Sequence, residues 1–299
     1  MKITKHYNSW TITVTEFDLN TATQDDIDVL GCLINHYTLV VLKNQKISVP
    51  TEEAVCKMFG ETLDELIGVE QLKKIQGRLT QPGGNITIRV TGEKDDAGQP
   101  GLFGFNHELK WHADKVERAN RRSLIWLYGE RGTLGSQTHF TNHVLAYNSL
   151  PVNVKEQIKD LKTVYIDTAN YSKDERETLA KVSDVSHTPP VVYTNVGGQT
   201  GIFLSWLHLD HFVGLDKEQS SEIAHVLEQH ILGNPAHIYK HDWEDGDVLL
   251  CEQWLGVHRR PAFQNMDKRV LHRIETDFSN VDFTKMQYAL SLVQWHDTI

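Results

Sequence analysis

The spacing of apolar residues divides the N-terminal part of the chain into three predicted elements. Apolar residues recur at helical intervals over 24–37 after an acidic start, which predicts a helix there. Residues 38–42 form a short β-branched run typical of a buried strand. Pro50 and the two glutamates that follow it begin a second helix, which reaches Gly60. The first sixty residues are therefore predicted to be helix, strand, helix.

The rest of the chain is richer in strands than in helices. Strands are predicted at 86–90, 123–128, 191–193, 202–204, 247–251 and 269–274. Helices are predicted at 140–150, ended by Pro151, and from an N-cap at Asp216 to about 231, with Gly233 as its stop. Because strands and helices do not alternate regularly, the pattern predicts a β-rich α+β fold. We expect a sandwich or barrel flanked by helices, not a doubly wound parallel sheet.

One stretch lacks any regular pattern. Gly92 to Gly104 is rich in glycine and aspartate, and it leads directly to Trp111 and His112. Loops of this length inside a domain are often lids or binding loops. We therefore expect a lid loop around residues 91–110.

Composition and charge narrow the class of protein. Of the 299 residues, 39% are hydrophobic and 23% charged, which suits a folded protein, and we expect a single domain over 1–299. The formal net charge of −10 disfavours binding of nucleic acid or an anionic membrane through a basic surface. A binding site for an anionic ligand must therefore contain nearby arginine or lysine side chains.

Cysteine usage and the absence of targeting patterns indicate a cytoplasmic protein. Cys32, Cys56 and Cys251 are odd in number and show no C-x-x-C spacing, so neither a disulfide framework nor a cysteine zinc site is expected. We find no secretory signal and no apolar run long enough to span a membrane. The composition is compatible with a homo-oligomer.

Two distant fragments carry the chemistry. In His112-Ala113-Asp114 the outer side chains are two residues apart, so on an extended strand they leave the same face of the backbone. His258 can supply a third ligand. Two imidazoles and one carboxylate can hold one face of an iron(II) ion, leaving other positions open for a chelating cosubstrate and dioxygen.

A cation for that cosubstrate lies downstream. Arg269 follows His258, and its guanidinium can pair with a carboxylate in a bidentate manner while keeping its charge. Arg269 and Arg273 fall on one face of the predicted strand, and buried arginines require anions. Thr138 is placed to lend a hydroxyl to the same carboxylate.

A second His-x-Asp, His208-Leu209-Asp210, competes for the metal. The spacing from His208 to His258 also suits a sandwich metal site. The preceding glycine-rich loop, the neighbouring Trp111 and the Thr138 segment favour His112. We interpret His208 and Asp210 as ordinary polar groups ahead of the Asp216 helix.

These motifs together resemble the taurine dioxygenase-like (TauD/TfdA) family of iron(II)- and 2-oxoglutarate-dependent oxygenases. The resemblance covers roughly residues 22–278 and includes the order His-x-Asp, threonine, distal histidine and arginine. It implies a double-stranded β-helix core, of the jelly-roll or cupin-like kind. It further implies iron held by His112, Asp114 and His258, and the distal carboxylate of 2-oxoglutarate bound by Arg269 with Thr138. Arg273 would assist there or hold an acidic group of the substrate.

The chain departs from the family pattern at two places. Glu252-Gln253-Trp254-Leu255 stands where the family commonly has an Asp-Asn pair, which affects the expected pocket wall. Lys115 follows the metal aspartate, where a small or apolar residue is usual.

The resemblance implies a dioxygenase that hydroxylates an unactivated carbon and releases succinate and carbon dioxide. Arg273, Lys115 and Arg89 suggest a small acidic or amino-acid-derived substrate. Desaturation or cyclisation in natural-product tailoring is an alternative use of the same cofactors. A non-catalytic metal-binding sensor or interaction module is a second alternative, although such a module has no need for Arg269 and Thr138. A zinc hydrolase with these ligands is a poor match to hydrolytic zinc patterns.

Overall fold

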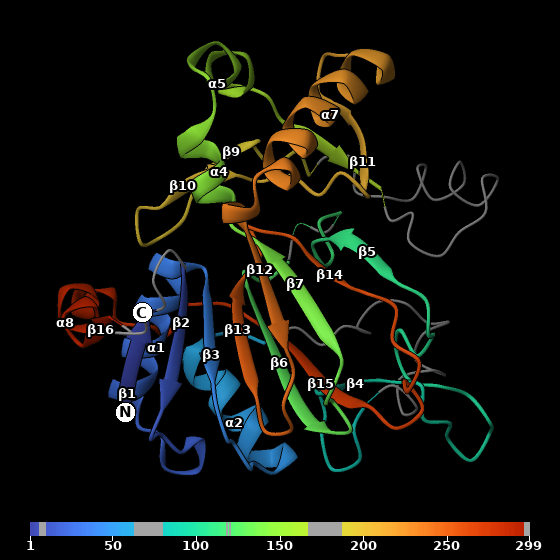
Figure 1. Ribbon diagram of the computed structural model, residues 1–299. Coiled ribbons are helices and arrows are strands. Elements are labelled where there is room, and N and C mark those ends of the chain that lie inside the picture. The colour runs from blue at the N-terminus through green and yellow to red at the C-terminus, as the bar shows by residue number, and fades with distance from the viewer. Residues whose placement is uncertain (6–9, 63–79, 118, 120, 167–186, 296–299) are drawn as a thin grey trace.

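Two β-sheets lie face to face at the centre of the molecule. The structure, a computed structural model, describes residues 1–5, 10–62, 80–117, 119, 121–166 and 187–295 (Figure 1). The larger sheet has eight strands and the smaller has four. Helices cover the outer face of the larger sheet and one end of the pair (Figure 1).

Hydrogen bonding sets the order of the strands in each sheet. The larger sheet runs β16 (Val293–Trp295), β1 (Lys2–Lys5), β2 (Thr11–Thr15), β3 (Leu39–Leu42), β13 (Val248–Glu252), β6 (Leu124–Arg131), β15 (Val270–Thr276) and β4 (Ile88–Thr91). The smaller sheet runs β12 (Ile238–Asp242), β7 (Gln137–Thr141), β14 (His258–Arg260) and β5 (Leu109–His112). Two short pairs join β8 (Thr163–Tyr165) to β11 (Leu209–Phe212) and β9 (Val192–Thr194) to β10 (Thr200–Ile202).

The helices are α1 (Gln24–Tyr37), α2 (Val49–Phe59), α4 (His143–Ser149), α5 (Val152–Ile158), α7 (Lys217–Gly233) and α8 (Met286–Ser291). Short 3-10 turns occur at Leu19–Thr21, Pro235–His237 and Phe283–Lys285. None of these helices is long and apolar enough to cross a membrane.

Apolar side chains fill the space on both sides of the larger sheet. Its inner face packs against the smaller sheet through a cluster that includes Leu127, Phe140, Trp243 and Leu271. Its outer face packs against α1 and α2 in a larger cluster. Because strand side chains alternate between faces, each central strand contributes to both clusters. The predicted β-rich jelly-roll with flanking helices is therefore confirmed, as two facing sheets and not as a closed barrel.

A third apolar cluster lies at one end of the sheets. It joins α4, α5 and α7 to the two short strand pairs, at the top of Figure 1. This part of the molecule carries residues 203–209, which reach back toward the metal ligands described below.

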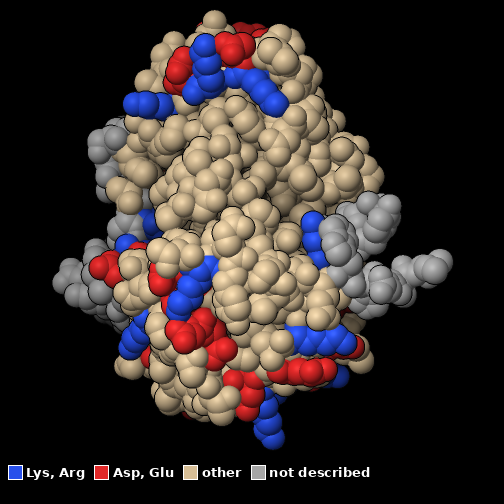
Figure 2. All heavy atoms as spheres, turned by 90° about the vertical axis from the view of Figure 1, so that its left-hand side faces the viewer, with Lys and Arg blue, Asp and Glu red and all other residues tan. Residues whose placement is uncertain are grey.

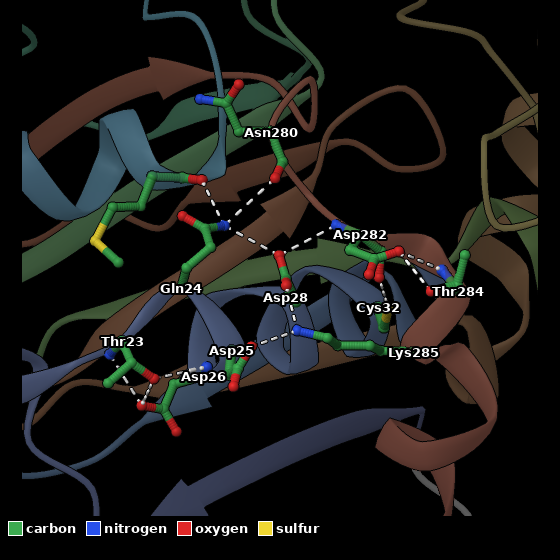
Figure 3. Close-up of polar contacts among 11 residues, drawn as sticks. Thr23, Gln24, Asp25, Asp26, Asp28, Cys32, Asn280, Asp282, Thr284 and Lys285 are labelled. Carbon is green, nitrogen blue, oxygen red and sulfur yellow. Dashed lines mark hydrogen bonds and ion pairs between the residues drawn. The ribbon is translucent and has the colours of Figure 1, made fainter.

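The C-terminal segment is fastened to α1 by polar contacts (Figure 3). The Lys285 ammonium lies 2.6 Å from carboxylate oxygens of both Asp25 and Asp28. The Gln24 amide donates to Asp28 and to the backbone carbonyl of Asn280. Beyond this contact, β16 pairs with β1 at the edge of the larger sheet.

Charged residues of both signs share the surface. On the face drawn in Figure 2, lysine and arginine side chains lie among aspartate and glutamate side chains, above and below a broad uncharged area.

Most predicted elements are confirmed, with corrections to the bounds of several of them. The helix expected from residue 140 begins at His143, because Phe140 belongs to β7 and the Asn142 side chain caps the helix by accepting from the Leu145 N–H. The strand expected at 86–90 begins at Ile88, and the strand expected at 202–204 ends at Ile202.

Candidate metal centre and anion pocket

Two neighbouring strands of the smaller sheet position the three predicted ligands. His112 is the last residue of β5, and Asp114 follows two positions later. His258 is the first residue of β14 and is the direct ladder partner of His112. The two imidazole centroids are consequently 4.4 Å apart.

The ligand atoms of these residues converge. Nε2 of His112 lies 3.5 Å from Oδ1 of Asp114, and Nε2 of His258 lies 3.7 Å from Oδ2. One ligand atom from each residue lies within 4.8 Å of the other two. Nδ1 of His112 is 2.6 Å from the Lys110 carbonyl, so it carries the proton and leaves the Nε2 lone pair free. That Nε2 is buried and has no hydrogen-bond partner in the described structure. This donor set fits an iron(II) ion.

Arg273 orients the ligand carboxylate. Its Nε and Nη2 lie 3.3 Å and 3.2 Å from Oδ2 of Asp114, and Nη2 also lies 3.7 Å from Glu275. Burial alone would raise the pKa of Asp114, but the adjacent imidazoles and the Arg121 guanidinium hold that pKa well below its usual range. The carboxylate is therefore ionised, as a metal ligand must be.

Gln253 supports the same carboxylate through the backbone. Its side-chain oxygen accepts from the Asp114 N–H at 3.2 Å, while its Nε2 donates to the Arg122 carbonyl at 2.7 Å and to Glu275 at 2.9 Å. Within the segment that departs from the family pattern, Gln253 thus contacts a predicted ligand residue.

A pocket adjoins the ligands between the two sheets. Its lining residues are Val90, Phe103, Leu109, Asp114, Leu127, Thr138, His258, Arg260, Arg269, Leu271 and Arg273. Five of the eleven lining residues are apolar, and the partners for an anionic ligand are the three arginines and the Thr138 hydroxyl.

Arg269 is the buried cation of this pocket. Its side chain is 1% exposed, and its Nε donates to the Ser136 hydroxyl at 3.1 Å. Among the described residues no carboxylate forms an ion pair with it. Thr138 accepts from the Trp243 indole N–H at 2.9 Å, which leaves the threonine O–H available as a donor. Arg269 and Thr138 are thus brought to one pocket, as the sequence predicts.

Two predicted substrate residues are not among those that line this pocket. Arg89 pairs with Glu93 at 2.9 Å and stands opposite His272 in the β4–β15 ladder, whereas the next residue, Val90, lines the pocket. Arg89 therefore points to the other face of the sheet. Lys115 lies next to the ligand Asp114, with Nζ 4.0 Å from Glu275.

The two polar residues of the second His-x-Asp, His208 and Asp210, lie in different surroundings. The His208 ring lies 6.5 Å from the His112 ring, and its Nδ1 is 2.9 Å from the Ser205 hydroxyl. Burial lowers the pKa of His208 to about 3, so its imidazole is neutral. Asp210 instead pairs with His211 and Lys217. The interpretation of His208 as an ordinary polar residue is therefore incomplete, because it lies beside the metal ligands.

Arg121 is a buried cation that sequence reasoning missed. Its guanidinium lies 5.0 Å from the Phe203 ring and 5.7 Å from the Trp254 ring. One of its nitrogens donates to the Gln253 carbonyl, while Nε and Nη1 have no hydrogen-bond partner among the described residues. No local motif marks this arginine, so only its position in the fold singles it out.

The sequence is similar to a known family of dioxygenases and to individual members of it. The family model described as taurine catabolism dioxygenase TauD, TfdA family, matches residues 3–274. Pentalenolactone F synthase of Streptomyces arenae is 26% identical over 215 residues, which cover 67% of this chain and 71% of the relative. The alpha-ketoglutarate-dependent 2,4-dichlorophenoxyacetate dioxygenase of Burkholderia sp. (strain RASC) is 21% identical over 248 residues, covering 80% of this chain and 81% of the relative.

The fold is likewise similar to a solved structure. A taurine dioxygenase from Burkholderia xenovorans superposes with a TM-score of 0.70 at 17% sequence identity, covering 92% of this chain and 90% of that chain.

Proposed function

This chain belongs to the TauD/TfdA family of dioxygenases, and from that membership we propose which of its residues carry the reaction and what kind of molecule it oxidises. It is an iron(II)- and 2-oxoglutarate-dependent dioxygenase, and therefore an oxidoreductase that acts on a small molecule. We further propose that residues 1–299 form one catalytic domain. The free, buried cysteines at 32, 56 and 251 support a reducing compartment such as the cytoplasm.

We assign the metal to His112, Asp114 and His258. Bound iron(II) would supply the oxidative decarboxylation of 2-oxoglutarate to succinate and carbon dioxide, with dioxygen as the oxidant, coupled to hydroxylation of an unactivated carbon. The protein's part is to present the two Nε2 lone pairs and one ionised carboxylate from a single side. Arg273 contacts that carboxylate directly, and Gln253 accepts from the backbone N–H of the same residue.

We assign the distal carboxylate of 2-oxoglutarate to Arg269. The observation that carries this assignment is a fully buried guanidinium, without a carboxylate partner among the described residues, in a pocket that also contains Asp114 and His258. A buried unpaired cation is costly, and a carboxylate removes that cost. The Thr138 hydroxyl can donate to the same carboxylate.

We propose a small acidic or amino-acid-derived substrate. In a chain of net charge −10, Arg121, Arg273 and Lys115 lie close to Asp114 and supply local positive charge. Arg121 adds two N–H donors beside the aromatic rings of Phe203 and Trp254. The relative named for 2,4-dichlorophenoxyacetate is named for a small aryloxyacetate, which carries one carboxylate, and this supports the class. Arg89 is left out, because it points to the other face of the sheet.

A second candidate is tailoring of a natural-product intermediate by desaturation or cyclisation. The similarity to pentalenolactone F synthase, an enzyme named for a natural product, favours it. The same metal and cosubstrate residues would serve both reactions, so only the product distinguishes them.

A substrate screen that measures succinate formation tests these assignments. Small carboxylates, sulfonates and amino-acid derivatives are compared, and mass spectrometry of the product separates hydroxylation (a gain of one oxygen) from desaturation (a loss of two hydrogens). Anaerobic addition of iron(II) and 2-oxoglutarate should produce the weak visible absorption of the chelate, and Arg269→Ala should reduce it at limiting 2-oxoglutarate. A protein that binds iron but produces neither the absorption nor succinate would refute the proposal.

A further inference from the structure

Arg260 fastens the loop before β5 to the strand that carries His258. It is 4% exposed and lies two residues after His258 on β14. Its Nη1 donates to the Phe103 carbonyl at 2.9 Å, and its Nη2 donates to the carbonyls of Phe105 and His107 at 2.6 Å and 2.8 Å. The guanidinium also lies 5.0 Å from the Phe105 ring. A single side chain thus holds three carbonyls of residues 103–107, which we call the clamp loop.

The clamp loop forms one wall of the anion pocket. Phe103 lines that pocket, and its ring meets the His112 ring edge-on at 6.3 Å. Its φ of 50° lies in the left-handed region, which a phenylalanine adopts only when its surroundings hold it there. The carbonyl of Phe103 is one of the three that accept from Arg260, so the residue with this conformation is hydrogen-bonded to Arg260.

Arg260 is also a second cation beside Arg269. Both line the pocket, and their Nη1 atoms lie 3.1 Å and 4.0 Å from the same Met266 sulfur. Among the described residues neither forms an ion pair with a carboxylate, and Nε of Arg260 is buried without a hydrogen-bond partner. Two buried guanidinium groups this close repel each other, and an anion placed against them removes that repulsion.

We propose that Arg260 couples binding of 2-oxoglutarate to ordering of the clamp loop; this rests on the proposed function of the pocket. The ligand's distal carboxylate offsets the charge of Arg260 together with that of Arg269. The guanidinium is thereby stabilised in the position from which it holds the three carbonyls. Because the coupling is a binding equilibrium it is reciprocal, and an ordered loop also strengthens binding of 2-oxoglutarate. Arg260 is a positioning residue in this scheme.

Hydrogen exchange of the clamp loop, measured by mass spectrometry, tests the coupling without turnover. The protein is loaded with manganese(II), and exchange of residues 101–108 is compared with and without 2-oxoglutarate. Arg260→Met removes the charge and the donors, whereas Arg260→Lys keeps the charge but cannot hold three carbonyls at once. Arg259→Met is the matched control, because Arg259 contacts the Trp111 ring and His139 instead.

In the wild type and in Arg259→Met, 2-oxoglutarate should slow exchange of the clamp loop by about tenfold. In Arg260→Met we expect that slowing to be lost and the dissociation constant for 2-oxoglutarate to rise by about tenfold. In Arg260→Lys we expect the slowing to be lost with a smaller change in affinity. Near-ultraviolet circular dichroism establishes that each variant is folded, and the lysine variant carries the test if the methionine variant is not.

The coupling would be overturned if, in a folded Arg260 variant, saturating 2-oxoglutarate slowed exchange of the clamp loop as much as it does in the wild type. Equal exchange of the wild-type loop with and without bound 2-oxoglutarate would overturn it as well. A wild-type protein that binds manganese(II) but does not bind 2-oxoglutarate would instead refute the proposed function, so the two failures are distinguishable.

Discussion

Arg273 contacts the metal-ligating carboxylate of Asp114 through two of its nitrogens, which lie 3.3 Å and 3.2 Å from the same oxygen, Oδ2. The other oxygen, Oδ1, faces the His112 ring. Glu275 lies on the same face of β15, and its carboxylate is 3.7 Å from Nη2 of Arg273. The sequence suggests a ligand-binding role for this arginine, whereas its contacts support an additional role in orienting Asp114.

Arg273→Met should weaken metal binding. Removing a side chain that orients a metal ligand typically costs about 10–100-fold in metal affinity. Titration calorimetry with manganese(II) measures the effect, and Arg89→Met is a matched control because Arg89 points to the opposite face of the sheet. Unchanged metal affinity together with a loss of 2-oxoglutarate binding would assign Arg273 to the cosubstrate instead.

Substitution of the two neighbouring histidines should have different consequences. His112→Ala removes a ligand and should abolish iron binding and turnover. His208→Ala should leave metal affinity nearly unchanged, because His208 is outside the convergent set of ligand atoms although its ring is 6.5 Å from that of His112. Metal titration of both variants checks this prediction. Loss of metal from the His208 variant with retention in the His112 variant would transfer the site to the second His-x-Asp.

Arg269→Ala should act on 2-oxoglutarate and not on the metal. Truncating one partner of a desolvated charge pair costs about 2–5 kcal/mol, so the affinity for 2-oxoglutarate should fall at least about thirtyfold. Equilibrium binding to the manganese(II)-loaded protein measures this change. An unchanged dissociation constant would show that the distal carboxylate binds elsewhere.

Stability should fall as the pH rises through the range in which His272 loses its proton. His272 lies between two carboxylates, with Nδ1 2.6 Å from Glu52 and Nε2 3.2 Å from Glu130. Burial alone would lower the pKa of His272, but these two acceptors outweigh it and raise the pKa from 6.5 to about 9. The folded state therefore holds a proton that the unfolded state releases between these values, and the resulting stabilisation is complete below 6.5 and lost above 9.

This contribution is at most about 3 kcal/mol. Urea unfolding of the wild type and of His272→Gln, at about pH 6 and about pH 9.5, measures it as the difference between the two pH dependences. The comparison with His272→Gln is needed because burial raises the pKa of Glu252 to about 8. Ionisation of Glu252 therefore also lowers the stability of the folded state as the pH rises. Equal pH dependence of the two proteins would contradict the prediction.

The convergence of His112, Asp114 and His258 could be predicted, because it depends on residue type and on spacing along the chain. His-x-Asp on an extended strand fixes which face two ligands share, and a downstream histidine with Arg269 completes the pattern. Some of the misplaced features also had signals in the sequence. Asn142 is a good N-cap, which favours a helix start at His143. Strand alternation separates Arg89 from its neighbour Val90 in the same way.

The remaining site residues could not be predicted, because their positions depend on contacts between distant segments. His208 reaches the ligands through the packing of residues 203–209 at the end of the sheets. Arg121 and Gln253 become neighbours only when β6 and β13 pair. No local periodicity records which loops meet after the sheets have formed.

The strand β5 has four residues and, within the part of the chain that the structure describes, is an edge strand paired only with β14. An edge strand this short has few backbone contacts to fix its alignment, and a slip by one residue would turn His112 toward the opposite face. An ion shared between His112 and His258 would therefore act as a cross-link between β5 and β14. Loading with metal should raise the melting temperature and favour the correct strand alignment, because only that alignment brings His112 and His258 to the same ion.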